Sequence, residues 1–114
     1  MEEIINFETL KQIIGEDKES IASFVEFFKE QSEIDIAEFT KFIKEKNYAE
    51  IAKCAHKLKS SYGSIGSTAV YNTLAELDKS AKENLEFDVI NGLFGKFLEL
   101  HSKILSEFDN FLNN

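Results

Sequence analysis

Two histidines, His56 and His101, have the side chains in this sequence best suited to nucleophilic chemistry, because a neutral imidazole is a competent nucleophile near pH 7. At three- and four-residue steps, the helix face around His56 carries small residues and lysines, namely Ala49, Ala52, Lys53, Lys59, Ser60 and Gly63. The opposite side of the same segment is apolar, with Ile51, Cys54, Leu58, Tyr62 and Ile65. We therefore predict that His56 projects from its helix into solvent.

His101 has different neighbours, because it occupies an apolar stripe. It follows Phe97 by four residues and precedes Ile104 and Phe108 by three and seven. We predict a partly buried histidine that is held by a hydrogen bond and that a partner protein does not reach.

The small residues around His56 leave room for another protein to bring a reacting group close to the imidazole. Gly63 inside a helix costs up to about 1 kcal/mol relative to alanine, so some other requirement must favour glycine there. A solvated surface histidine without a reaction is the alternative interpretation of this face.

The spacing of apolar residues predicts that helices position these side chains. Proline is absent and glycine occurs only five times, so few positions oppose long helices. We expect five helices, at about residues 7–14, 18–46, 48–65, 67–84 and from 87 onward. Gly15 is expected to stop the first helix, Asp17 to cap the second, and Asn47 to separate the second from the third.

Four amphipathic helices with short connections bury their apolar stripes most simply as an antiparallel bundle. We therefore expect an all-α fold, an antiparallel four-helix bundle with a short N-terminal helix across one end. Residues 1–114 are expected to form a single domain and a monomer, because one chain supplies all four bundle helices. The start at Met1 and the end at Asn114 favour a free-standing protein over a segment of a larger kinase.

The composition argues against several classes of function. A net charge of -8, with 13 lysines and no arginine, disfavours nucleic acid and membrane surfaces as partners. No apolar run approaches the roughly 20 residues that span a bilayer, and the acidic N-terminus is unlike a signal peptide, so we expect a cytoplasmic protein. The single cysteine, Cys54, forms no internal disulfide and agrees with a reducing compartment.

The segment from Ala55 to Gly66, AHKLKSSYGSIG, resembles the signature of histidine-containing phosphotransfer domains, the relay modules of two-component phosphorelays. Five residues match this pattern in register, namely His56, Leu58, Lys59, Gly63 and Gly66. The opening Phe7-Glu8-Thr9-Leu10 and the Asn47-Tyr48 start of the histidine helix are also typical, so the resemblance covers essentially the whole chain. Ser60 is a departure, because glycine is often found at that position.

The resemblance implies that His56 accepts a phosphoryl group from a receiver-domain aspartate and passes it to another. Lys59 would stabilise the charge of the phosphate, and Lys57 is either a second phosphate contact or plain solvated surface. Many relatives place Glu or Gln on the next helix to orient the histidine ring. Asp78 occupies that place here, where it either orients the ring or is simply a solvated carboxylate.

The implied partners are response-regulator receiver domains and a hybrid histidine kinase. The docking face would comprise Ala49, Ala52, Lys53, Lys57, Ser60 and Gly63. The resemblance implies a phosphotransfer protein that is not itself an enzyme and needs no cofactor, since Mg²⁺ is expected on the receiver domain.

Three other functions are considered. A metal-binding bundle is disfavoured, because Glu99 lies two residues from His101, unlike the Glu-x-x-His spacing of di-iron bundles. A hydrolase is disfavoured because no Ser/His/Asp or Cys/His set is placed together. A non-catalytic interaction module that uses the same face is the main alternative, and only a test of His56 distinguishes it from a relay protein.

Overall fold

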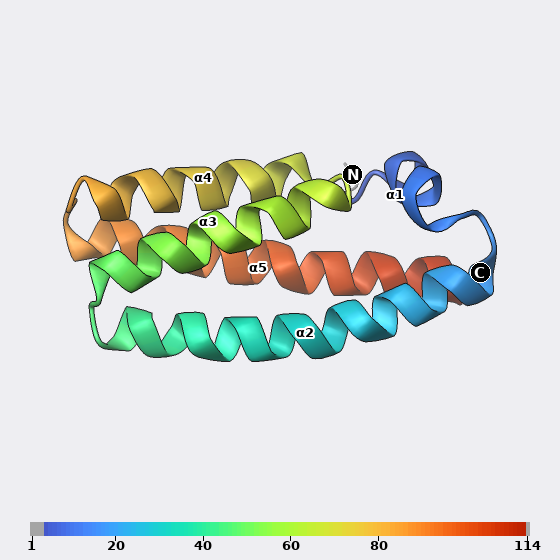
Figure 1. Ribbon diagram of the computed structural model, residues 1–114, viewed down its shortest axis with the longest axis horizontal. Helices are drawn as coiled ribbons and strands as arrows, with labels where there is room; N and C mark the ends of the chain where they lie inside the picture. The colour runs from blue at the N-terminus through green and yellow to red at the C-terminus, as the bar shows by residue number, and fades with distance from the viewer. Residues whose placement is uncertain (1–3, 114) are drawn as a thin grey trace.

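The computed structural model describes residues 4–113 and shows four long helices that run alternately up and down, with a short helix at one end (Figure 1). The helices are α1 (Phe7–Ile14), α2 (Lys18–Lys44), α3 (Tyr48–Ser64), α4 (Thr68–Lys82) and α5 (Phe87–Leu112). The expected all-α bundle with a short N-terminal helix is confirmed. Within the described part of the chain, no helix is both long enough and apolar enough to cross a membrane.

Side chains cap the first four helices at their N-termini. Asn6, Asp17, Asn47 and Ser67 each accept a hydrogen bond from the backbone N–H three residues later. Each cap satisfies one of the backbone donors that a helix start leaves without an intrahelical partner. The predicted cap at Asp17, the stop at Gly15 and the break at Asn47 are therefore confirmed.

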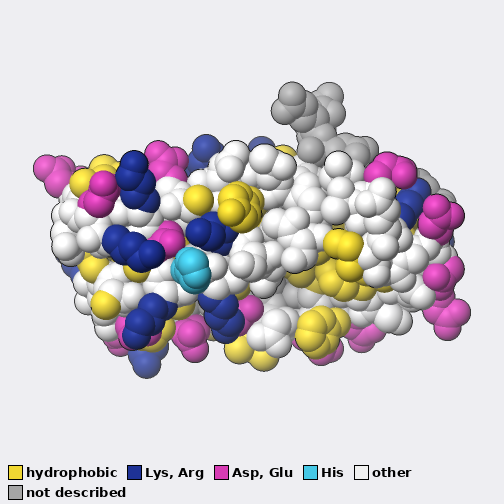
Figure 2. All heavy atoms as spheres, turned by 45° about the horizontal axis from the view of Figure 1, so that its top comes forward, with side chains coloured by type: hydrophobic (Ala, Val, Ile, Leu, Met, Phe, Trp, Pro, Cys, Tyr) yellow, Lys and Arg dark blue, Asp and Glu magenta, His cyan; other side chains and the backbone are white. Residues whose placement is uncertain are grey.

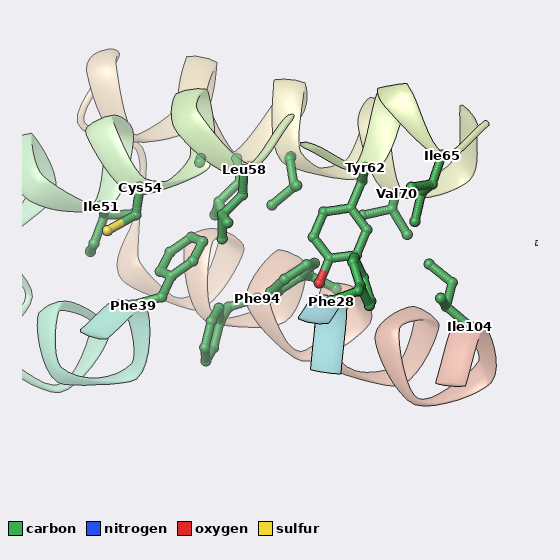
Figure 3. Packing of buried hydrophobic residues seen from close by; sticks show 14 of the residues in the cluster. Phe28, Phe39, Ile51, Cys54, Leu58, Tyr62, Ile65, Val70, Phe94 and Ile104 are labelled. Atoms are coloured by element: carbon green, nitrogen blue, oxygen red, sulfur yellow. The ribbon is translucent and has the colours of Figure 1, made fainter. Parts of the chain in front are cut away.

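The apolar side predicted for the histidine helix is confirmed. The buried side chains of α3 include Ile51, Cys54, Leu58 and Tyr62, and Ile65 directly after this helix is also buried. In α4 they include Val70, Leu74, Leu77 and Ala81. Figure 3 shows labelled side chains of α3, such as Leu58 and Tyr62, pointing toward apolar side chains of α2 and α5, such as Phe39 and Phe94. Burial of one side of α3 leaves its other side, which carries His56, facing away from the core.

The fourth helix ends at Lys82, two residues earlier than predicted, because the chain there turns left-handed. Asn84 has a φ of 53°, and the Leu85 N–H returns to the Ser80 carbonyl at 3.1 Å. This 6→1 bond is the hydrogen bond of a Schellman-type helix end, in which asparagine is one of the tolerated residues. Lys82 is therefore the last residue of α4.

Gly66 joins the short N-terminal helix to the bundle. Its φ of 77° lies in the left-handed region, and its carbonyl accepts a hydrogen bond from Asn6 N–H at 3.2 Å. A Cβ atom at this position would lie 2.8 Å from the Cβ of Asn6, closer than packed carbon atoms approach. Glycine is therefore required here by both backbone conformation and contact.

Candidate functional site

His56 lies on the outer face of α3, and its side chain is 67% exposed. Figure 2 shows its ring on the surface, surrounded by lysine side chains. The predicted outward orientation is confirmed. The ring therefore presents a nitrogen to any protein that covers this face.

Asp78 on α4 is the acidic neighbour of the His56 ring. Its Oδ2 lies 3.4 Å from His56 Nδ1, and its side chain is only 8% exposed. At this distance the contact is longer than a strong hydrogen bond. Of the two interpretations left open by the sequence, the structure excludes a solvated carboxylate and places Asp78 beneath the ring.

Two lysines surround the carboxylate of Asp78. Lys59 Nζ lies 3.9 Å from Oδ2, and Lys82 Nζ donates to Oδ2 at 3.5 Å. Lys59 also lies 5.8 Å from the centre of the Tyr71 ring, which holds its side chain against α4. Two positive charges therefore lie beside one buried negative charge next to the histidine.

Lys82 was not identified as a site residue from the sequence. The signal that could have found it is its spacing, because it follows Asp78 by four residues on α4, and oppositely charged side chains at that spacing meet on a helix. Its relation to His56 depends on how α3 packs against α4, which the spacing does not reveal.

A hollow of about 560 Å³ lies next to His56 between α3 and α4. It is lined by Tyr48, Ala49, Ala52, Lys53, His56, Ala81, Lys82 and Asn84. Three alanines form part of its wall, which explains why the surface recedes there. The small side chains beside His56 thus form a hollow, and Ala52, which is 6% exposed, offers a partner little area.

The other predicted docking residues do not line this hollow. Ser60 is exposed, and Lys57 Nζ lies 3.4 Å from Asp35 on α2, so Lys57 points away from Asp78. Gly63 is not simply part of an open face, because a Cβ atom there would lie 3.0 Å from Cδ2 of Tyr71. The close approach of Tyr71 from α4 is the requirement that favours glycine.

The second histidine, His101, has no access to partners. It is 9% exposed, and its Nδ1 lies 2.7 Å from the hydroxyl oxygen of Tyr62 in a buried hydrogen bond. Burial lowers the pKa of His101 and raises that of Tyr62. The prediction of a partly buried, hydrogen-bonded histidine is confirmed.

Cys54 is the remaining candidate nucleophile, and its surroundings disfavour that role. The thiol is buried, and burial, together with the negative charge of Glu38, raises its pKa to about 11. A thiol with so high a pKa is almost entirely protonated near neutral pH, and the thiolate is the reactive form. Among residues 4–113, no three His, Cys, Asp or Glu side chains are grouped to hold a metal ion.

The fold and the site together define a helical bundle with one accessible histidine, beside a buried carboxylate and two lysines. The sequence matches the Hpt domain family over residues 23–111, and the chain belongs to that family. Members of this family carry phosphoryl groups in two-component phosphorelays. A comparison with curated proteins and another with solved structures found no match.

Proposed function

We propose that His56 is the phosphoryl acceptor of this Hpt domain, taking the group from a receiver-domain aspartyl phosphate and passing it to the aspartate of another receiver domain. The exposure of the ring is the observation that carries the proposal, because its Nδ1 faces Asp78 and its Nε2 therefore lies on the accessible side. A neutral imidazole needs no separate base to attack phosphorus.

The charges around His56 support a phosphoryl group at Nε2. A phosphohistidine adds nearly two negative charges to a chain with a net charge of -8. Screening over about 8–10 Å makes nearby groups more influential than distant carboxylates. Lys59 and Lys82 are within that range through their shared contact with Asp78, so we assign both to stabilising the phosphate.

The partner would provide what this chain does not. In-line transfer to an aspartate needs a cation to neutralise the phosphoryl oxygens, and we propose that a receiver domain holds this Mg²⁺ in its own acidic pocket. The hollow beside His56, together with Lys53 and Ser60, would form the docking face. We further propose that the protein works as a monomeric single domain in the cytoplasm, with a hybrid histidine kinase upstream.

Transfer of label from a receiver domain tests this proposal. A receiver domain that carries a radiolabelled phosphoryl group is incubated with the chain and Mg²⁺, and we expect acid-labile, base-stable label on the chain. His56→Gln should abolish the label while circular dichroism shows an unchanged helical content. Because the variant retains His101, label that persists in it would place the reaction elsewhere. Binding of the receiver without label would support the interaction module instead.

A further inference from the structure

The buried carboxylate of Asp78 has fewer hydrogen-bond donors than it can accept. Its Oδ1 is buried and accepts no hydrogen bond from any described residue, although Lys82 Nζ lies 3.2 Å away. Its Oδ2 accepts a hydrogen bond from Lys82 Nζ and faces His56 Nδ1. A buried carboxylate with an unused acceptor is stabilised by each additional hydrogen bond that a neighbouring group donates to it.

An ionised carboxylate only accepts hydrogen bonds, and this restricts the state of the imidazole. A proton on Nδ1 is attracted to Asp78, whereas a lone pair on Nδ1 is repelled by it. The neutral ring therefore carries its proton on Nδ1 and its lone pair on Nε2. A Gln or Asn amide would not restrict the ring in this way, since an amide can donate as well as accept.

We propose that Asp78 also retains the proton on Nδ1 after phosphorylation, and so makes His56 a fast phosphoryl donor; this inference rests on the proposed function. On acceptance, the Nε2 lone pair forms the N–P bond while the P–O bond of the aspartyl phosphate breaks. The ring, still protonated on Nδ1, is then positive. On donation, the N–P electron pair returns to Nε2 as the P–O bond to the next aspartate forms.

No proton moves in either step of this sequence. The departing group is a neutral imidazole, which leaves far more readily than the imidazolate that a ring without the Nδ1 proton would become. Asp78 thus contributes to the rate of donation through its charge, in addition to orienting the ring.

Some charged groups near the ring favour a positive charge on the imidazole, and others oppose it. From α3, Lys53 and Lys59 are positive, and from α4, Lys82 is positive; all three oppose a positive ring. Lys57 is paired with Asp35 of α2. The carboxylate of Asp78 lies 3.4 Å from Nδ1, and the phosphoryl group on Nε2 adds nearly two negative charges, so the charges in direct contact with the phosphorylated ring are negative.

Asp78→Asn tests the role of the negative charge. The asparagine side chain has nearly the same shape, but it is neutral and its NH₂ group can donate a hydrogen bond to an unprotonated Nδ1. His56 is phosphorylated with phosphoramidate, so the measurement does not depend on a partner, and ¹⁵N NMR reports the protonation of Nδ1. We expect a protonated Nδ1 in the natural chain and an unprotonated one in Asp78→Asn at about pH 8. Transfer from the variant to a receiver domain should be slower by roughly tenfold or more.

Two further variants distinguish charge from structure. Asp78→Glu keeps the charge and should restore a protonated Nδ1 and fast donation. Asp35→Asn removes another poorly exposed carboxylate, one that contacts Lys57 and not the ring, and should change neither measurement. An unprotonated Nδ1 in the phosphorylated natural chain, or equal donation rates for Asp78→Asn, would overturn the inference while leaving phosphorylation of His56 intact. Absence of exchange with any receiver domain would instead contradict the proposed function.

Discussion

The hydroxyl oxygen of Tyr62 and Nδ1 of His101 lie 2.7 Å apart in a hydrogen bond that joins α3 to α5 inside the core. Tyr62 is 1% exposed and packs edge-on against the rings of Phe28 and Phe97. The helix that presents His56 to solvent is therefore anchored on its inner side by a polar contact as well as by apolar packing. An anchored helix limits how far His56 moves when a partner docks.

Removal of the Tyr62 hydroxyl should destabilise the bundle. Tyr62→Phe keeps the ring but leaves Nδ1 of His101 buried without its partner, which costs about 1–3 kcal/mol. Urea unfolding followed by circular dichroism measures this loss. Tyr48→Phe is the matched control, because its hydroxyl donates to the Leu85 carbonyl at 3.0 Å near the surface, where water can replace it. Equal stability of Tyr62→Phe and the natural chain would contradict the structural role of the pair.

Stability should fall as the pH is lowered below about 6.5, the ordinary pKa of histidine. Burial lowers the pKa of His101 in the folded chain, so the unfolded chain binds a proton at a higher pH than the folded chain. Between the two pKa values, the unfolded state holds more protons, and the free energy of unfolding decreases by at most about 1.4 kcal/mol per pH unit. Above both values, this contribution is constant.

Urea unfolding at a series of pH values between about 5.5 and 8 measures this slope. The His56→Gln background removes the titration of the exposed histidine. Adding His101→Gln to it should flatten the dependence over this range. A slope that survives in the double variant would assign the effect to other groups.

Loss of Lys82 should weaken the phosphorylated state of His56. Lys82→Gln removes one of the two cations around Asp78, and we expect roughly a three- to tenfold faster loss of the phosphoryl group to water or to a receiver, equivalent to about 0.7–1.4 kcal/mol. The decay of label on His56 measures this change. Lys79→Gln, an exposed lysine of the same helix outside this cluster, should decay at the natural rate. Identical rates for both variants would exclude Lys82 from the site.

Two glycines should respond to alanine in opposite directions. Gly66→Ala should destabilise the fold by about 2 kcal/mol or more, because a left-handed φ and the contact with Asn6 both oppose a side chain. Gly92→Ala should stabilise it by about 0.5–1 kcal/mol, since Gly92 is exposed within α5 and a Cβ there meets open space. Thermal unfolding compares the two, and a stable Gly66→Ala variant would contradict the tight junction with α1.

The amino-acid sequence by itself determined the helices, their buried faces and the exposure of His56. Apolar residues at three- and four-residue steps decide which side of a helix is buried whatever it packs against, and so the inward side of α3 and the burial of His101 could be predicted. The caps at Asp17 and Asn47 are equally local, since each acts on a backbone N–H only three residues away.

Only the tertiary structure decided what lies around the imidazole. The burial of Asp78, the arrival of Lys82 and the position of Tyr71 against Gly63 all depend on how α4 is rotated and placed against α3. Periodicity within one helix carries no information about that rotation, because it results from the packing of both helices against the rest of the core. The chemistry of the site therefore depends on a contact between helices that the helical pattern does not specify.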